Sequence, residues 1–130
     1  MAESMSLQLA PVGVVRKVSE SESAIEIRPE YRDGTHGIEP GDSLDVLFWM
    51  HKLHPDERRT LMAHPRGDRS RPIRGVFALR SPMRPNPIGV TNVRVVRVEQ
   101  DRLVVEGLDA KDGSPVIDIK AGVSRNASPS

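Results

Sequence analysis

The feature that most constrains the fold is a series of short Val- and Ile-rich runs, each broken after a few residues by Gly, Pro or Asp. Runs of this length and composition are typical of β-strands separated by tight turns. Aromatic residues make up only 3% of the chain, so β-branched and leucine side chains must build the core. The pattern favours a mainly β barrel or sandwich. The runs lie at 9–18, 25–27, 44–50, 73–79, 88–99, 103–105 and 116–119.

The longest run, at 88–99, changes its apolar face part-way along. Val93 and Val95 fall on one face of a strand, whereas Val96 and Val98 fall on the other. Such a switch predicts a β-bulge or a bent barrel strand. Residues 56–64 have helical propensity and are the one segment whose composition disagrees with an all-strand pattern.

The chain of 130 residues shows no repeat and no linker that would divide it. We expect one domain over 7–121, with flexible termini at 1–6 and 122–130. The absence of cysteine excludes disulfides, thiolate metal sites and cysteine nucleophiles. No apolar run reaches the roughly 18–20 residues of a membrane span, and no signal-peptide pattern opens the chain, so we expect a cytoplasmic protein.

The net charge of +1 conceals an uneven distribution. Between residues 51 and 97 there are eleven Lys or Arg and three acids, whereas acids dominate the first third of the chain. A basic middle segment can attract phosphate groups. A solvated arginine-rich loop would look the same in the sequence, and the charge pattern alone does not separate the two interpretations.

The segment at 79–91, LRSPMRPNPIGVT, carries the chemistry. Its prolines at 82, 85 and 87 fix the backbone and remove donors, so the segment forms a stiff, irregular loop. Arg80 and Arg84 can hold carboxylates or phosphates by paired hydrogen bonds. From the residues alone, a ligand site and a proline-rich barrel corner fit equally well.

The spacing Arg-Ser-Pro-x-Arg-Pro-Asn-Pro-Ile-Gly at 80–89 resembles the hallmark of the TsaA-like (TrmO-type) methyltransferase family. Segments 48–52, 74–78 and 108–120 resemble other parts of the same family, so the resemblance covers roughly 11–120. It implies a compact, single-domain β-barrel of about seven short strands with long loops. It also implies a homodimer that binds S-adenosylmethionine near the subunit boundary and methylates N6 of threonylcarbamoyl-adenosine at position 37, in the tRNA anticodon loop.

The resemblance also implies a set of cofactor-binding positions. Asp112 has a competing interpretation as an ordinary Asp-Gly turn residue. The positions are His51, Lys52, Arg80, Val90, Lys111, Asp112, Gly113 and Ser114.

An adenine N6 nucleophile must lose a proton during methyl transfer, so a base is useful. Asp118 is the candidate catalytic residue for that task or for orienting the acceptor, with Asn86 as its hydrogen-bonding partner. The competing interpretation is that Asp118 only pairs with Lys120 or an arginine.

Arginines are the obvious candidates for contacts with the phosphates of an anticodon loop. Aromatic residues that could stack on bases are scarce, and most of them fall in runs expected to be buried. No carboxylate completes a metal site with the histidines at 51, 54 and 64, so we expect no metal. The candidate substrate-binding residues are Arg58, Arg59, Arg66, Arg69, Arg71 and Arg84.

Two segments depart from the family pattern. Residues 17–24 (KVSESESA) lack the proline–glutamine pair that usually helps to hold the cofactor, and Ala121-Gly122 replace the usual proline and tyrosine after the last strand. Two alternatives to tRNA methylation therefore remain: a methyltransferase that acts on a small metabolite, and a non-catalytic binding module on the same barrel.

Overall fold

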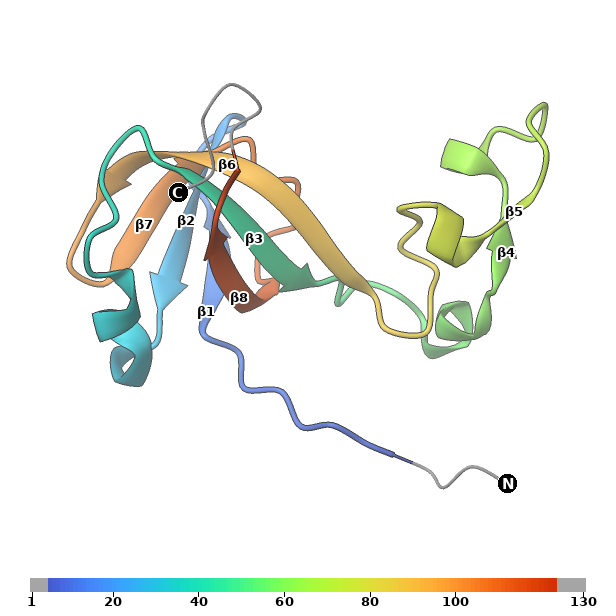
Figure 1. Ribbon diagram of the computed structural model, residues 1–130, viewed down its shortest axis with the longest axis horizontal. Helices are drawn as coiled ribbons and strands as arrows, with labels where there is room; N and C mark the ends of the chain where they lie inside the picture. The colour runs from blue at the N-terminus through green and yellow to red at the C-terminus, as the bar shows by residue number, and fades with distance from the viewer. Residues whose placement is uncertain (1–4, 124–130) are drawn as a thin grey trace.

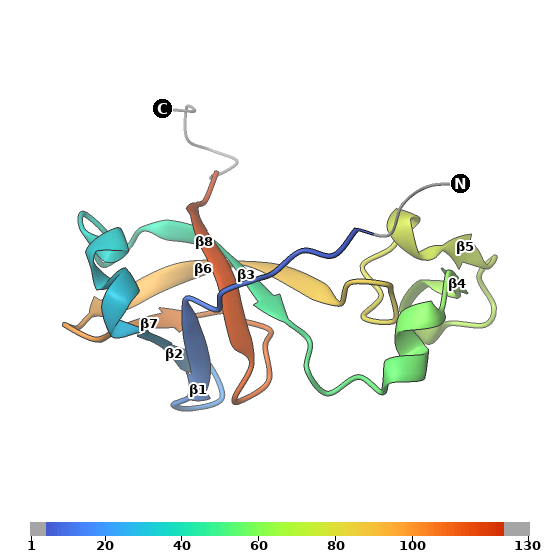
Figure 2. The same ribbon diagram turned by 90° about the horizontal axis from the view of Figure 1, so that it is seen from below.

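The computed structural model describes residues 5–123 and is built around a closed six-stranded barrel (Figures 1 and 2). Neighbouring strands pair antiparallel in the order β1-β2-β7-β6-β3-β8. The prediction of a mainly β barrel is confirmed. The strands are β1 (Gly13–Lys17), β2 (Glu22–Ile27), β3 (Ser43–Trp49), β6 (Ile88–Val98), β7 (Arg102–Glu106) and β8 (Pro115–Ala121).

The barrel core is almost entirely aliphatic, as the composition predicts. Along β3, Leu44, Val46 and Phe48 point inward, and the residues between them are half-buried on the outer face. Phe48 is the only aromatic side chain in the core among the described residues. The other strands contribute Val15, Ile25, Ile27, Val93, Val95, Leu103, Val105 and Val116.

The predicted irregularity in the longest strand is confirmed. β6 pairs with β7 through Val95 and Val105, and then through Arg97 and Val104, so Val96 is the extra residue of a bulge. A second register shift lies on β8, where Ile117 is extra between the partners of Leu47 and Phe48.

Residues 50–87 leave the barrel between β3 and β6 and form what we call the arm, drawn green to yellow in Figures 1 and 2. Its two short strands pair only with each other and belong to no part of the barrel sheet. The arm contains η2 (Pro55–Arg59), β4 (Met62–Ala63), η3 (Pro65–Gly67), β5 (Arg74–Gly75) and η4 (Val76–Ala78), where η denotes a 3₁₀ helix.

Two sequence-based assignments in the arm need correction. The strand expected over 73–79 ends at Gly75 and continues as the turn η4. One terminal nitrogen of Arg84 donates to the carbonyl oxygens of Val76 and Leu79. These hydrogen bonds take the place of those that a neighbouring strand would make to the two carbonyls. The segment 56–64 is neither a full helix nor a full strand, because a 3₁₀ turn precedes the two-residue strand β4.

The segment after β2 forms the 3₁₀ helix η1 (Pro29–Thr35) over one end of the barrel. The termini expected to be flexible, 1–6 and 122–130, lie mostly outside the described residues. Within 5–123, no helix is long and apolar enough to cross a membrane.

Candidate functional site

At one end of the barrel, a turn before β8 meets the residue that follows β3. The Ser114 hydroxyl donates to the Lys111 carbonyl at 2.6 Å and lies 3.3 Å from Nδ1 of His51. The turn depends on Gly113, whose φ of +84° is left-handed. The fold thus brings the predicted cofactor residues of the turn, 111–114, beside His51. Ser114, which contacts His51, is 63 residues away from it in the sequence. We call His51, Lys52 and 111–114 the barrel-end cluster.

The cluster is fastened to β1 as well. The Lys17 backbone N–H donates to Oδ1 of Asp112 at 2.9 Å, and the Gly113 N–H donates to the Val15 carbonyl at 2.7 Å. The Asp112 side chain therefore holds the turn in place, which agrees with its turn interpretation. The contribution of Lys17 has no signal in the sequence, because its backbone contact depends only on strand register.

Two further predicted residues share the outer face of the barrel. Leu47 on β3 pairs with Val90 on β6 and with Asp118 on β8. Directly paired residues project from the same face of a sheet. Since Val46 and Phe48 point inward, Leu47, Val90 and Asp118 point outward, and Val90 is 44% exposed.

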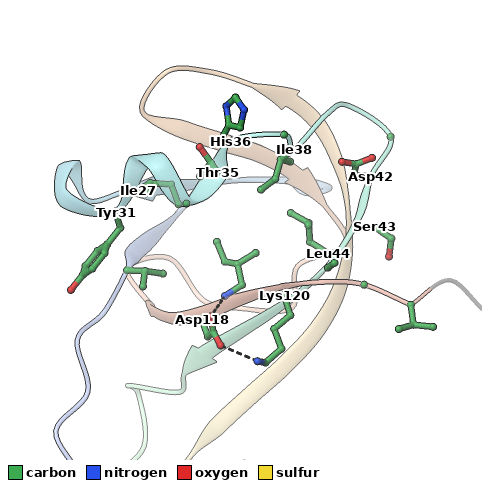
Figure 3. A pocket seen from close by; sticks show the side chains of 18 of the residues that line it. Ile27, Tyr31, Thr35, His36, Ile38, Asp42, Ser43, Leu44, Asp118 and Lys120 are labelled. Atoms are coloured by element: carbon green, nitrogen blue, oxygen red, sulfur yellow. Dashed lines mark hydrogen bonds and ion pairs between the residues drawn. The ribbon is translucent and has the colours of Figure 1, made fainter. Parts of the chain in front are cut away.

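The Asp118 carboxylate is already engaged. Oδ1 accepts from the Ile119 backbone N–H at 2.9 Å, and Oδ2 lies 3.3 Å from Nζ of Lys120, as Figure 3 shows. This is the pairing that the competing interpretation expects. Asn86 lies in the loop before β6, and within 5–123 no hydrogen bond joins its side chain to Asp118.

Asp118 also lines a depression of about 1080 Å³ at the opposite mouth of the barrel (Figure 3). Its walls come from η1, from the loop that follows it and from the ends of strands, and Ile27, Ile38 and Leu44 are among its apolar lining residues. None of the predicted cofactor residues lines it, so it is distinct from the barrel-end cluster.

Two of the predicted RNA-binding arginines are engaged within the chain. The Arg58 guanidinium lies 5.2 Å from the centroid of the Trp49 ring, and its Nε donates to the Pro85 carbonyl at 2.8 Å. Arg84 donates to the carbonyls of Val76 and Leu79, the latter at 2.7 Å. Both arginines hold the arm together and against the end of β3.

Three of the remaining predicted RNA-binding arginines line a second depression, of about 1070 Å³, in the arm. Every residue that lines it lies between 62 and 83, and none belongs to the barrel. The structure therefore does not bring Arg80 together with His51 within one chain. Arg59 ends η2 on the exposed surface and does not line the depression. The arginines that line it are Arg66, Arg69, Arg71, Arg74 and Arg80.

Asp68 lies in the loop between these arginines. Hydrogen bonds from the hydroxyl and the backbone N–H of Ser70 hold the pKa of the Asp68 carboxyl below its usual range. Its nearest cation is Arg71, at 3.9 Å. Within the described chain, no group of three or more His, Cys, Asp or Glu could hold a metal ion.

Comparison with known proteins identifies the family. The model of the tRNA-methyltransferase O N-terminal domain matches residues 11–126. The chain belongs to this family. The resemblance drawn from the hallmark loop is confirmed.

Archaeal relatives of similar length are described as binding S-adenosyl-L-methionine. An S-adenosyl-L-methionine-binding protein of Archaeoglobus fulgidus is 45% identical over 125 residues, covering 86% of each chain. A probable S-adenosyl-L-methionine-binding protein of Pyrococcus horikoshii is 44% identical over 116 residues, covering 88% of this chain and 82% of its own. Their descriptions name the cofactor that the hallmark predicts.

Solved structures of TrmO share the fold. One is 27% identical with a TM-score of 0.71, and TrmO from Pseudomonas aeruginosa is 26% identical with a TM-score of 0.69. The chain spans 62% of the length of each of these proteins.

Proposed function

We propose that this chain is an S-adenosylmethionine-dependent methyltransferase whose acceptor is N6 of threonylcarbamoyl-adenosine at position 37 of tRNA. The observation that carries the proposal is the barrel-end cluster, where a hydrogen-bonded turn from 111–114 meets His51 in a chain that has the family's hallmark loop.

The cluster fits a nucleoside-containing sulfonium. A Cβ built on Gly113 would have only His51 Nε2 near it, at 3.8 Å, so the surface of the turn is open for a ligand to approach closely. The turn offers backbone carbonyls, and His51 and Ser114 add polar groups. The exposed Val90 contributes an apolar wall on the adjoining face. Lys52 and Lys111, both exposed, would meet the carboxylate end of the cofactor.

When bound, S-adenosylmethionine supplies an electrophilic methyl group for an in-line displacement. The protein then has to hold the acceptor nitrogen in line with the methyl carbon and the sulfur. Most of the rate acceleration comes from this proximity and orientation. Asp118, on the same outer face as Val90, is our candidate to accept the N6 proton or to orient the base; its pairing with Lys120 would position the carboxylate. Asn86 would hydrogen-bond to the acceptor.

We further propose that a second copy of the chain completes each cofactor site. Within one chain Arg80 lines the arm depression, whereas His51, at the start of the arm, contacts the turn at the barrel end, so an arm that reaches the barrel end of a partner would bring the two together. Leu61 and Ile73 support this arrangement, because they are large apolar side chains that are 58% and 52% exposed and lie outside the arm depression.

The first test measures the cofactor and the acceptor separately. Calorimetry should detect S-adenosylmethionine binding, and Arg80→Ala should weaken it about ten-fold or more, the usual range for a hydrogen bond from a charged group. Arg59→Ala, another exposed arginine of the arm, is the matched control and should bind normally.

Mass spectrometry of nucleosides should then find methylated threonylcarbamoyl-adenosine in treated tRNA. Cofactor binding without this product would favour a small-molecule acceptor, and no binding at millimolar cofactor would favour a binding module.

The second test addresses the shared site. Arg80→Ala and His51→Ala are each expected to have strongly reduced activity alone when the cofactor is limiting. If the two residues act across the subunit boundary, a mixture of the two variants contains heterodimers with one intact site. Such a mixture should recover about a quarter of wild-type activity. No recovery after verified subunit exchange would place both residues in one chain's site and contradict the arrangement.

A further inference from the structure

The depression in the arm combines positive charge with an exposed aromatic ring. Phe77, which also lines the depression, is 80% exposed. No carboxylate-bearing residue lines it. Among the described residues, Arg66, Arg69 and Arg74 have no ion-pair partner, and only Arg71 approaches an acid, Asp68. The depression is thus a strongly cationic surface with a flat apolar patch, and it is distinct from the barrel-end cluster.

The exposed ring is held on a rigid support. Val76, just before Phe77, is 1% exposed and, with Pro87, is one of two buried apolar side chains in the arm. Arg84 donates to the carbonyls of Val76 and Leu79, which flank the ring in sequence, and the Leu79 N–H closes the turn on the Val76 carbonyl at 3.1 Å. Because the backbone that carries the ring is fixed in this way, little backbone entropy is lost when Phe77 binds a flat ligand.

We propose that this depression binds an unpaired nucleotide of RNA, whose base stacks on Phe77 while neighbouring phosphates contact Arg66, Arg69 and Arg74. The inference rests on the proposed function for the identity of the RNA, and it adds the residue that recognises an unstacked base. Phe77 was expected in a buried strand, and its exposure removes the shortage of stacking partners that the sequence indicates.

The chemistry favours single-stranded RNA over other anionic partners. An acidic peptide would pair with the arginines but would leave the Phe77 ring without a matching flat surface. A duplex would present phosphates but not base faces, because its bases are stacked on one another. An anticodon loop offers both phosphates and splayed bases.

The position of Arg80 links the depression to methyl transfer. Arg80 lines the same depression and is our candidate to reach a partner's cofactor. RNA held on Phe77 would therefore lie beside the methyl donor, with the target base and the stacked base at different positions along one loop.

The test is a binding measurement that needs no methyl transfer. Fluorescence anisotropy would compare a labelled, unmodified anticodon stem–loop with a fully duplex RNA of equal length, across a series of salt concentrations. Phe77→Leu, which keeps an apolar side chain but removes the flat ring, should weaken stem–loop binding roughly 5- to 150-fold, the range for one stacked base. Phe77→Trp should restore it, and duplex binding should change with neither variant.

Arginine variants separate charge from stacking. Arg69→Gln should lower the slope of log affinity against log salt by about one, whereas Phe77→Leu should leave the slope unchanged. Arg16→Gln, an exposed arginine on the barrel, is the matched control and should alter neither quantity. Thermal melting should be unchanged for every variant, since each replaced side chain is exposed.

The inference is overturned if wild-type protein does not bind the stem–loop, if Phe77→Leu binds it normally, or if the loss extends equally to duplex RNA. The proposed function fails separately. Stem–loop binding through Phe77 without methyl transfer would refute the acceptor assignment and keep the inference about Phe77. Methylation of tRNA that does not depend on Phe77 would keep the acceptor assignment and refute the inference.

Discussion

The barrel and the arm are stabilised in different ways. Among the described residues, nearly every buried apolar side chain belongs to the barrel strands or the turns that join them; Val76 and Pro87 are the exceptions in the arm. The arm has only a two-residue ladder between β4 and β5. What holds it is a small set of arginine-to-carbonyl hydrogen bonds and the contact of Arg58 with Trp49.

This difference separates stability from recognition. Hydrophobic burial closes the barrel, and hydrogen bonds fix the turn at 111–114 beside His51 and β1. The arm leaves apolar and cationic side chains uncovered, which costs stability but leaves groups available to bind. Substitutions should therefore have large effects on unfolding in the barrel and small ones in the arm.

The largest effect should follow from removing a core side chain. Leu103→Ala is expected to lower the free energy of unfolding by about 2–5 kcal/mol, because Leu103 is 1% exposed and the substitution leaves a cavity. Urea denaturation followed by far-UV circular dichroism measures it. Phe77→Ala in the arm, which removes a larger side chain, should change the value by no more than about 0.5 kcal/mol. Equal losses would mean that the arm is part of the same core.

A pair of glycine substitutions makes the same comparison sharper. A Cβ on Gly89 would lie 2.5 Å from Cζ of Phe48, whose ring covers it across the β3–β6 ladder. Gly89→Ala should therefore cost about 1–3 kcal/mol through overpacking. In the arm, a Cβ on Gly75 would meet nothing closer than 3.9 Å. Gly75→Ala should unfold at nearly the wild-type urea concentration, and a large loss there would contradict the contrast.

The glycine at 89 also shows what a sequence motif can predict and what it cannot. The hallmark spacing marks the position but does not reveal which group packs against it, and that group is the Phe48 ring. The short apolar runs and the change of face at 88–99 predicted strands and a bulge correctly, because both patterns depend on residues within one strand.

The arm was less predictable because its contacts are not local. Arg84 bonds to carbonyls five and eight residues earlier, and Arg58 bonds to one 27 residues later. No period in the sequence reports such contacts, so the exposure of Phe77 and the engagement of Arg58 could not be predicted. The approach of Ser114 to His51 likewise follows from barrel closure, whereas the hallmark supplied the residues but not their arrangement.

A smaller effect is expected from the contact that seats the arm on the barrel. Arg58→Ala removes a cation–π contact and the hydrogen bond to Pro85, together worth about 1–2 kcal/mol locally. Trp49 is the only tryptophan of the chain, so its emission reports this contact directly. The emission should shift to longer wavelength and become more accessible to iodide, while the urea midpoint of the barrel stays nearly constant. Arg59→Ala, one residue away and without these contacts, should leave the emission unchanged.

The smallest effect should come from an ion pair on the barrel surface, and it should depend on pH. Nε of Arg94 donates to Oε1 of Glu106 at 2.6 Å, and this hydrogen bond and charge hold the pKa of Glu106 below its usual range. Because the pKa is lower in the folded state, the pair stabilises the protein above the unfolded pKa of about 4.3, and this stabilisation is lost as pH falls through the folded value. Arg94→Gln should thus lower the urea midpoint slightly at pH 7 and not at all in strong acid. Ser70→Ala removes the hydroxyl hydrogen bond that lowers the pKa of Asp68 in the arm and keeps the backbone one. It should not change the urea midpoint at either pH, because the arm adds little to global stability. A pH-dependent shift of the midpoint in Ser70→Ala would show that arm and barrel unfold together.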